Sequence, residues 1–134
     1  MFIFIMSYSN LGFLVFFLLE FKDYGKHYMG FSAEELQVAD SMFFFPWTFK
    51  LAYGLVSDSF TIGGYRRKYY IVICGCLGTL SILLLVMPFS TGTFSFFACG
   101  MLHMAAFAFN DVLVDSIMCY EAKKDPVRGS EDLQ

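Results

Sequence analysis

One segment of the chain joins an apolar stretch to a short basic loop. It reads PWTFKLAYGLVSDSF over residues 46–60 and GGYRRKYY over residues 63–70. A lysine lies inside the apolar part, and a second apolar stretch follows the basic loop at once. Basic residues concentrate in the short cytoplasmic loops that connect membrane-spanning helices. The segment therefore predicts a cytoplasmic hairpin between two membrane spans.

The composition indicates a membrane protein. Hydrophobic residues make up 57% of the 134 residues, 18 of them are Phe, and only 16% are charged. Soluble domains have roughly 25% charged residues. The apolar runs are also longer than core helices require, since a span needs about 20 residues. We expect an all-α, polytopic bundle in contact with membrane lipid.

The charge and the cysteines exclude several other classes of protein. The net charge of −3 provides no basic surface for a nucleic-acid partner. The cysteines have no paired spacing and no nearby histidine cluster, so neither a zinc site nor a disulfide framework is indicated. They are Cys74, Cys76, Cys99 and Cys119. We expect no metal and no cofactor.

Four apolar segments predict four spans, at about residues 2–21, 33–56, 69–87 and 94–120, followed by a polar tail over 121–134. The first lacks the basic region and cleavage site of a signal peptide, so we interpret it as a retained span. The second is expected to begin at the capping box of Ser32 and Glu35. It is expected to kink at Pro46.

The loops differ in their content of Lys and Arg, and this predicts the orientation. Two basic residues lie in the first loop, Lys22 and Lys26. Six lie in the second loop and the tail: Arg66, Arg67, Lys68, Lys123, Lys124 and Arg128. By the positive-inside rule the amino terminus and the tail are cytoplasmic.

Charged residues inside the expected spans are candidates for function. They are Lys50, Asp111 and Asp115, with Asp40 nearer the outer end of the second span. An ionised group at the bilayer centre costs at least about 2.5 kcal/mol, so it needs a partner or an aqueous cavity. Lys50 and Asp115 lie at similar depths, about six and five residues from the cytoplasmic ends of their spans, which predicts a pair.

The two carboxylates of the fourth span are four residues apart and share one helical face. Repulsion between Asp111 and Asp115 favours binding of a proton, as a proton-coupled carrier requires. The alternative is a structural ion pair between Lys50 and Asp115, with Asp111 facing water. A lone histidine in the same span, His103, is interpreted as a hydrogen-bonded structural residue.

The hairpin motifs resemble a known family. Gly-x-x-x-Asp before a loop that begins Gly-Tyr-Arg-Arg resembles the segment between spans two and three of the major facilitator superfamily. The fuller pattern is Pro-Trp-x-x-Lys, Gly-x-x-Ser-Asp-Ser and Gly-Tyr-Arg-Arg, and it is similar to the folate-biopterin transporter family. The resemblance extends from the capping segment FSAEELQ to NDVLVDS at residues 110–116. It departs at Leu51 and Thr61, where the family usually has proline.

The resemblance implies a function and an incomplete chain. Such carriers have about twelve spans in two halves, so these four spans are expected to be an N-terminal fragment whose partners include the remaining spans. The implied function is secondary active transport of folate, biopterin or a related small organic anion by alternating access, and not enzymatic catalysis. Two alternatives remain: a tetraspan protein with a packing or regulatory role, and a carrier for another solute.

The resemblance also implies roles for individual residues. The intramembrane charges Lys50, Asp111 and Asp115 are candidates for the substrate and proton pathway, and so is Trp47 of the Pro-Trp-x-x-Lys match, whose ring could stack on a pterin. The resemblance assigns gating by charge contacts in the outward-facing state to the loop residues Gly54, Asp58, Gly64, Arg66 and Arg67. Plain positive-inside anchoring is the alternative for the basic residues of this loop.

Overall fold

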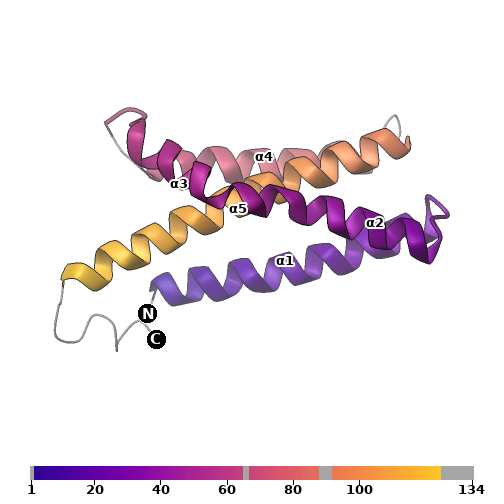
Figure 1. Ribbon diagram of the computed structural model, residues 1–134, viewed down its shortest axis with the longest axis horizontal. Helices are drawn as coiled ribbons and strands as arrows, with labels where there is room; N and C mark the ends of the chain where they lie inside the picture. The colour runs from indigo at the N-terminus through magenta and orange to yellow at the C-terminus, as the bar shows by residue number, and fades with distance from the viewer. Residues whose placement is uncertain (1, 65–66, 88–91, 125–134) are drawn as a thin grey trace.

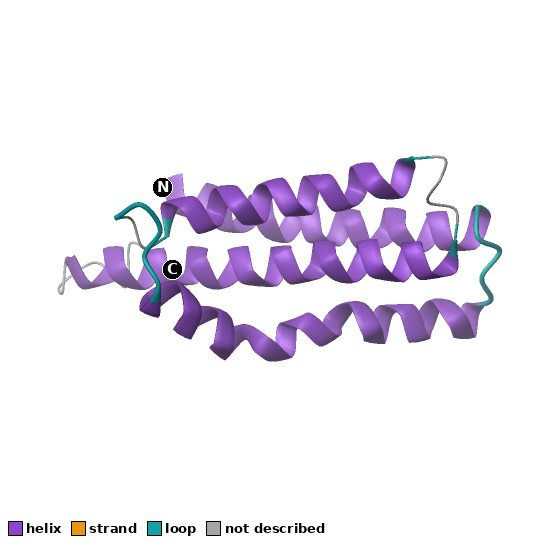
Figure 2. Cartoon of the chain, turned by 90° about the horizontal axis from the view of Figure 1, so that it is seen from above, coloured by secondary structure: helices purple, strands orange, loops and turns teal. Residues whose placement is uncertain are grey.

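The computed structural model describes residues 2–64, 67–87 and 92–124, and their regular elements are helices. Five are α-helices and one is a 3₁₀ helix, η1. In chain order they are α1 (Phe2–His27), α2 (Ala33–Phe44), η1 (Phe45–Phe49), α3 (Lys50–Ser59), α4 (Lys68–Val86) and α5 (Thr93–Lys124). The helices lie lengthwise in one elongated bundle (Figures 1 and 2).

The start of α2 has the capping box that the sequence predicted. The backbone N–H of Ser32 donates to Oε2 of Glu35 at 2.8 Å, and the backbone N–H of Glu35 donates to Oγ of Ser32 at 3.3 Å. Two backbone donors at the helix start are thus satisfied without a partner from elsewhere. Glu34 and Glu35 also place negative charge at the positive end of the helix dipole.

The expected kink at Pro46 is a full interruption of the helix. Proline lacks an N–H and its ring clashes with the preceding turn, so a continuous helix over 33–56 is broken into α2, η1 and α3. The Thr48 hydroxyl donates to the carbonyl of Phe45 at 2.7 Å within the tight turn. Trp47 therefore lies in the interruption, and Lys50 begins the helix that follows it.

The hairpin between α3 and α4 depends on two glycines in the left-handed region of backbone conformation. The φ angles of Gly63 and Gly64 are +58° and +80°, which side chains with a Cβ rarely adopt. A Cβ at Gly63 would also lie 2.9 Å from Cε2 of Tyr69. The reversal that the glycines predicted is confirmed, and it brings the start of α4 back toward the end of α3.

Helix α5 forms the centre of the bundle and contacts all the other helices. An aromatic core surrounds its first half, where Phe21 of α1 lies 4.2 Å from Phe96 and 4.7 Å from Phe43 of α2, measured between ring centroids. Gly100 allows this close approach, because a Cβ there would lie 2.5 Å from Cε1 of Phe43.

Two helices of the described part of the chain are long and apolar enough to cross a membrane. They comprise residues Lys68–Val86 and Thr93–Tyr120. The expected spans over 2–21 and 33–56 fall on α1 and on the interrupted α2–η1–α3 unit, and their crossing of a membrane stays a prediction. Apolar side chains such as Leu51 and Phe94 are more than four-fifths exposed. Such surfaces suit contact with lipid or further helices.

Candidate functional site

An ion pair links the first residue of α3 to the middle of α5. Nζ of Lys50 lies 2.5 Å from Oδ2 of Asp111, and the side chains are 36% and 17% exposed. The prediction that Lys50 pairs with Asp115 was therefore wrong. Side chains lean toward the N-terminus of their own helix, and for Lys50 this direction leads away from the hairpin. The ammonium thus contacts Asp111, one helical turn farther from the hairpin than Asp115.

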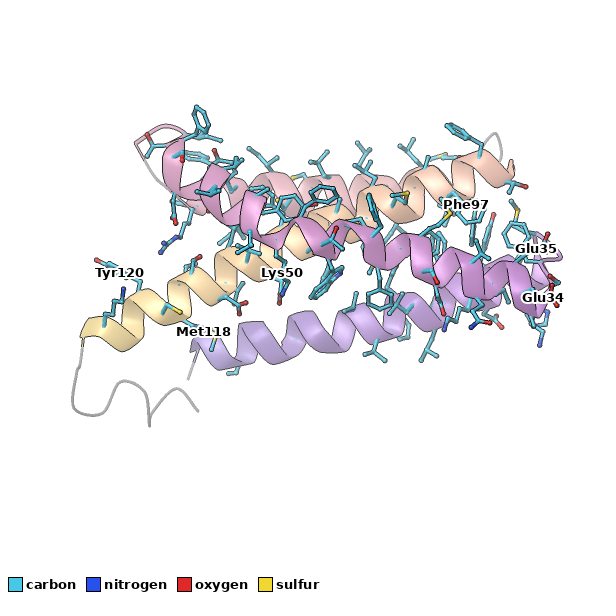
Figure 3. The ribbon with its side chains drawn as sticks, viewed as in Figure 1. Glu34, Glu35, Lys50, Phe97, Met118 and Tyr120 are labelled. Carbon is cyan, nitrogen blue, oxygen red and sulfur yellow. The ribbon has the colours of Figure 1, made fainter. Side chains whose placement is uncertain are left out.

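Trp47 lies beside the same ammonium group. Nζ of Lys50 is 4.3 Å from the centroid of the Trp47 ring, within the range of a cation–π interaction. The indole also stacks against Phe107 of α5, with centroids 6.4 Å apart. Its Nε1–H is buried and has no acceptor among the described residues. The ammonium of Lys50, labelled in Figure 3, is thus held between a carboxylate and an aromatic face.

Asp115 has a different environment from Asp111. Its side chain is exposed on the surface of the bundle, and no ion pair of Asp115 occurs in the described part of the chain. The charges of Asp111 and Lys50 nevertheless both act on its carboxylate. The structure therefore brings Trp47, Lys50 and Asp111 together and places Asp115 next to them without a direct contact.

Arg67 connects three helices at the hairpin. Its Nη2 lies 3.3 Å from Oδ1 of Asp58 at the end of α3, and its Nη1 donates to the carbonyl of Ser116 in α5 at 3.2 Å. The Asp58 side chain is largely exposed, whereas that of Arg67 is mostly covered. Three of the predicted gating residues therefore have defined positions: Asp58 and Arg67 pair, and Gly64 makes the turn between them.

The other two predicted gating residues are Gly54 of α3 and Arg66. A Cβ at Gly54 would lie 3.7 Å from Cγ1 of Val112, so this glycine faces α5 at ordinary contact distance. Arg66 lies outside the described residues. The contacts of Arg67 with both α3 and α5 give it a structural role beyond simple positive-inside anchoring.

A second ion pair was missed by the sequence reasoning. Nζ of Lys22 in α1 lies 2.6 Å from Oδ2 of Asp40 in α2. Asp40 was recognised as a charge that needs a partner, but Lys22 was counted only as a loop residue. Lys22 and Asp40 lie at similar distances in sequence before and after the turn at Gly30. In two antiparallel helices such residues lie side by side, and this spacing is the signal that could have identified the pair.

His103 has the structural environment that the sequence suggested. Its Nδ1 lies 3.1 Å from the carbonyl oxygen of Gly78 in α4, and its ring stacks on Phe17 of α1 with centroids 3.8 Å apart. Because a carbonyl oxygen can only accept, Nδ1 carries the proton in this contact. His103 thereby links three helices, and it borders a cavity of about 320 Å³ between α4 and α5.

Long apolar helices joined by a basic hairpin, with charges held inside them, indicate an α-helical membrane protein. The sequence profile of the BT1 family matches residues 6–134, and the chain belongs to this family.

Curated relatives are named as transporters. The "Probable folate-biopterin transporter 6" of Arabidopsis thaliana is 32% identical over 60% of this chain and 16% of its own length. The "Folate-biopterin transporter" of Synechocystis sp. is 32% identical over 66% of this chain and 18% of its own length. The "Folate transporter 1" of Plasmodium falciparum is 45% identical over 30% of this chain and 8% of its own length.

These matches establish relationship over a limited part of each relative. The chain spans about a fifth or less of the length of the curated relatives it matches. None of the solved structures matches it significantly. The names of the relatives describe transporters and not enzymes, which agrees with the sequence interpretation.

Proposed function

We propose that this chain forms the first four spans of a secondary active transporter for folate, biopterin or a related small organic anion. Transport would proceed by alternating access and would be coupled to protons. The observation that carries the proposal is the Lys50–Asp111 ion pair beneath the Trp47 ring, within the helical bundle. The names of the relatives supply the class of substrate.

Lys50 has the properties of an anion-binding group. An ammonium has three donors, and the structure gives it one hydrogen-bond partner, Asp111. A carboxylate of the substrate can therefore approach the same nitrogen from the part of its surface that remains exposed. Asp111 would hold the ammonium in place between substrates and limit the cost of a charge in a dry environment.

Trp47 is suited to recognition of the ring system of a pterin. Its face would stack on a flat heteroaromatic ring, and its unsatisfied Nε1–H would donate to a ring acceptor once the surrounding helices move. Buried donors without acceptors are uncommon in folded proteins, and a substrate is one explanation for such a group.

The Asp58–Arg67 contact would act as the cytoplasmic gate of the carrier, together with Gly54, Gly64 and Arg66. Arg67 binds both Asp58 and the carbonyl of Ser116, so its release would free α3 and α5 at once. The hairpin, the amino terminus and the tail would then lie on the cytoplasmic side, as the distribution of basic residues predicts.

The partners of the chain would be membrane lipid and the remaining spans of the complete carrier. Four spans cannot enclose a central cavity that opens alternately to two sides, and such cavities lie between repeated halves. The exposed apolar side chains of α3, α4 and α5 provide surfaces for these contacts.

Uptake of labelled folic acid and biopterin into cells that express the complete carrier tests the proposal. Lys50→Gln should reduce uptake at least tenfold at equal surface expression, because the anion loses its cation. Lys22→Gln is a matched control, since Lys22 is also paired with an aspartate, but this aspartate is Asp40 of α2 and not Asp111 beside Trp47. Equal uptake by the wild type and Lys50→Gln would refute the role of Lys50. Absence of uptake of either compound by the wild type would favour the non-transporting tetraspan protein.

A further inference from the structure

A charge imbalance remains next to the Lys50–Asp111 pair. These two residues neutralise each other, while Asp115 adds a negative charge that no cation of the described residues pairs with. Asp115 lies inside the stretch Thr93–Tyr120, which is long and apolar enough to cross a membrane. A lone ionised carboxylate is costly in such a helix, and a bound proton removes this cost.

No ion pair joins Asp115 to a described cation of the elements packed around this part of α5, including Lys68 at the start of α4 and Lys123 of α5 itself. Arg67 approaches from the start of α4, but its guanidinium binds Asp58 and the carbonyl of Ser116. Tyr53 of α3 and Tyr70 of α4 lie against Phe109 on α5. The 3₁₀ helix η1 carries no charged residue. The charged residues of α1 and α2 are Glu20, Lys22, Asp23, Lys26, Glu34, Glu35 and Asp40. The end of α1 and the start of α2 lie at the end of the bundle away from the α3–α4 hairpin (Figure 1).

Lys50 is therefore the cation that influences Asp115 most directly. Asp111 and Asp115 are one helical turn apart on the same face, so an ammonium bound to Asp111 also lies near the second carboxylate. By Coulomb's law, both the ammonium of Lys50 and the carboxylate of Asp111 act on the charge of Asp115, with opposite signs. The balance between these two effects changes whenever a further anion binds to Lys50.

We propose that Asp115 is the proton-binding group of the carrier and that its electrostatic contact with Lys50 couples proton binding to substrate binding. This inference rests on the transport function proposed above. A substrate carboxylate bound at Lys50 adds a negative charge to the Lys50–Asp111 pair, so Asp115 then binds a proton more tightly. By thermodynamic reciprocity, a proton on Asp115 strengthens binding of the anion by the same factor. Asp111 acts as a positioning residue that holds Lys50 between the two sites.

Equilibrium binding of folic acid to the purified complete carrier, measured between pH 5.5 and 8, tests this coupling. The ligand keeps its charge over this range, because a glutamate carboxylate titrates near pH 4.3. Affinity of the wild type should rise as the pH falls, by a factor within the roughly 5–150-fold range of typical coupling between two sites.

Substitutions separate Asp115 from its neighbours. Asp115→Asn should bind folic acid at every pH with the affinity that the wild type has at low pH, when Asp115 carries a proton. Asp115→Ser provides a second neutral variant should the first fold poorly. Asp115→Glu should retain the pH dependence. Asp111→Asn should bind more weakly but keep a pH-dependent affinity. His103→Asn tests the histidine of α5, and it should also keep the pH dependence.

Two results with the variants would overturn the proposal. One is an affinity of Asp115→Asn for folic acid that depends on pH as in the wild type, and the other is an affinity of His103→Asn that does not change with pH. A wild type that binds folic acid with the same affinity at every pH would also overturn it and would leave the transport function standing. A wild type that binds neither folic acid nor biopterin at any pH would contradict the transport function itself. It would then also refute the proposed coupling, which depends on that function.

Discussion

Separation of the Lys50–Asp111 pair should cost the bundle a large share of its stability. Lys50→Ala leaves the Asp111 carboxylate without its cation, and that side chain is only 17% exposed. Removal of one partner of a buried ion pair costs about 3–5 kcal/mol. Because Lys50 is itself 36% exposed and water reaches part of the pair, we expect a value near the lower limit, about 3 kcal/mol.

A double-mutant cycle on the detergent-solubilised carrier provides the measurement. Lys50→Ala and Asp111→Asn should each destabilise the protein, and the double variant should lose much less than the sum, since neither charge is then stranded. The cycle of Lys50 with Asp115 is the matched control, and its coupling should be smaller than that of Lys50 with Asp111, because Lys50 and Asp115 have no direct contact. Additive losses at positions 50 and 111, or stronger coupling at positions 50 and 115, would refute the observed pairing.

Three other substitutions or labels test separate parts of the structure. Gly100→Ala should destabilise the protein by about 1–3 kcal/mol in a thermal or denaturant assay, because the new methyl group displaces the ring of Phe43; an unchanged stability would contradict the close packing there. Asp58→Asn should reduce uptake while expression and insertion stay near the wild-type level, and normal uptake would exclude a gating role. Cysteine labels at positions 26 and 124 should react from opposite sides of the membrane, with Lys124 on the cytoplasmic side. Labelling of both positions from one side would refute the orientation.

The local features of the fold were predictable from short stretches of sequence. The Ser32–Glu35 capping box, the interruption at Pro46 and the turn at Gly63 and Gly64 each depend on the chemistry of a few adjacent residues. Backbone donors, a missing N–H and a positive φ angle act within one helical turn. These predictions were therefore confirmed without knowledge of how the helices pack.

The partners of the charged side chains were harder to predict. Counting residues from a helix end locates a charge only to within about a turn, and Asp111 and Asp115 differ by one turn. The direction of the Lys50 side chain decides between them, and this direction follows from the start of α3 after the 3₁₀ segment. The Lys22–Asp40 pair required the alignment of two antiparallel helices, which no single motif in the sequence specifies.

Uptake of folic acid into proteoliposomes that contain only the purified complete carrier tests the central claim most directly, since no other transporter is present. We predict saturable uptake by the wild type and by Lys22→Gln, and at least a tenfold loss in Lys50→Gln. Equal uptake by Lys50→Gln and the wild type would contradict the claim that this lysine, held by Asp111 and Trp47, binds the transported anion.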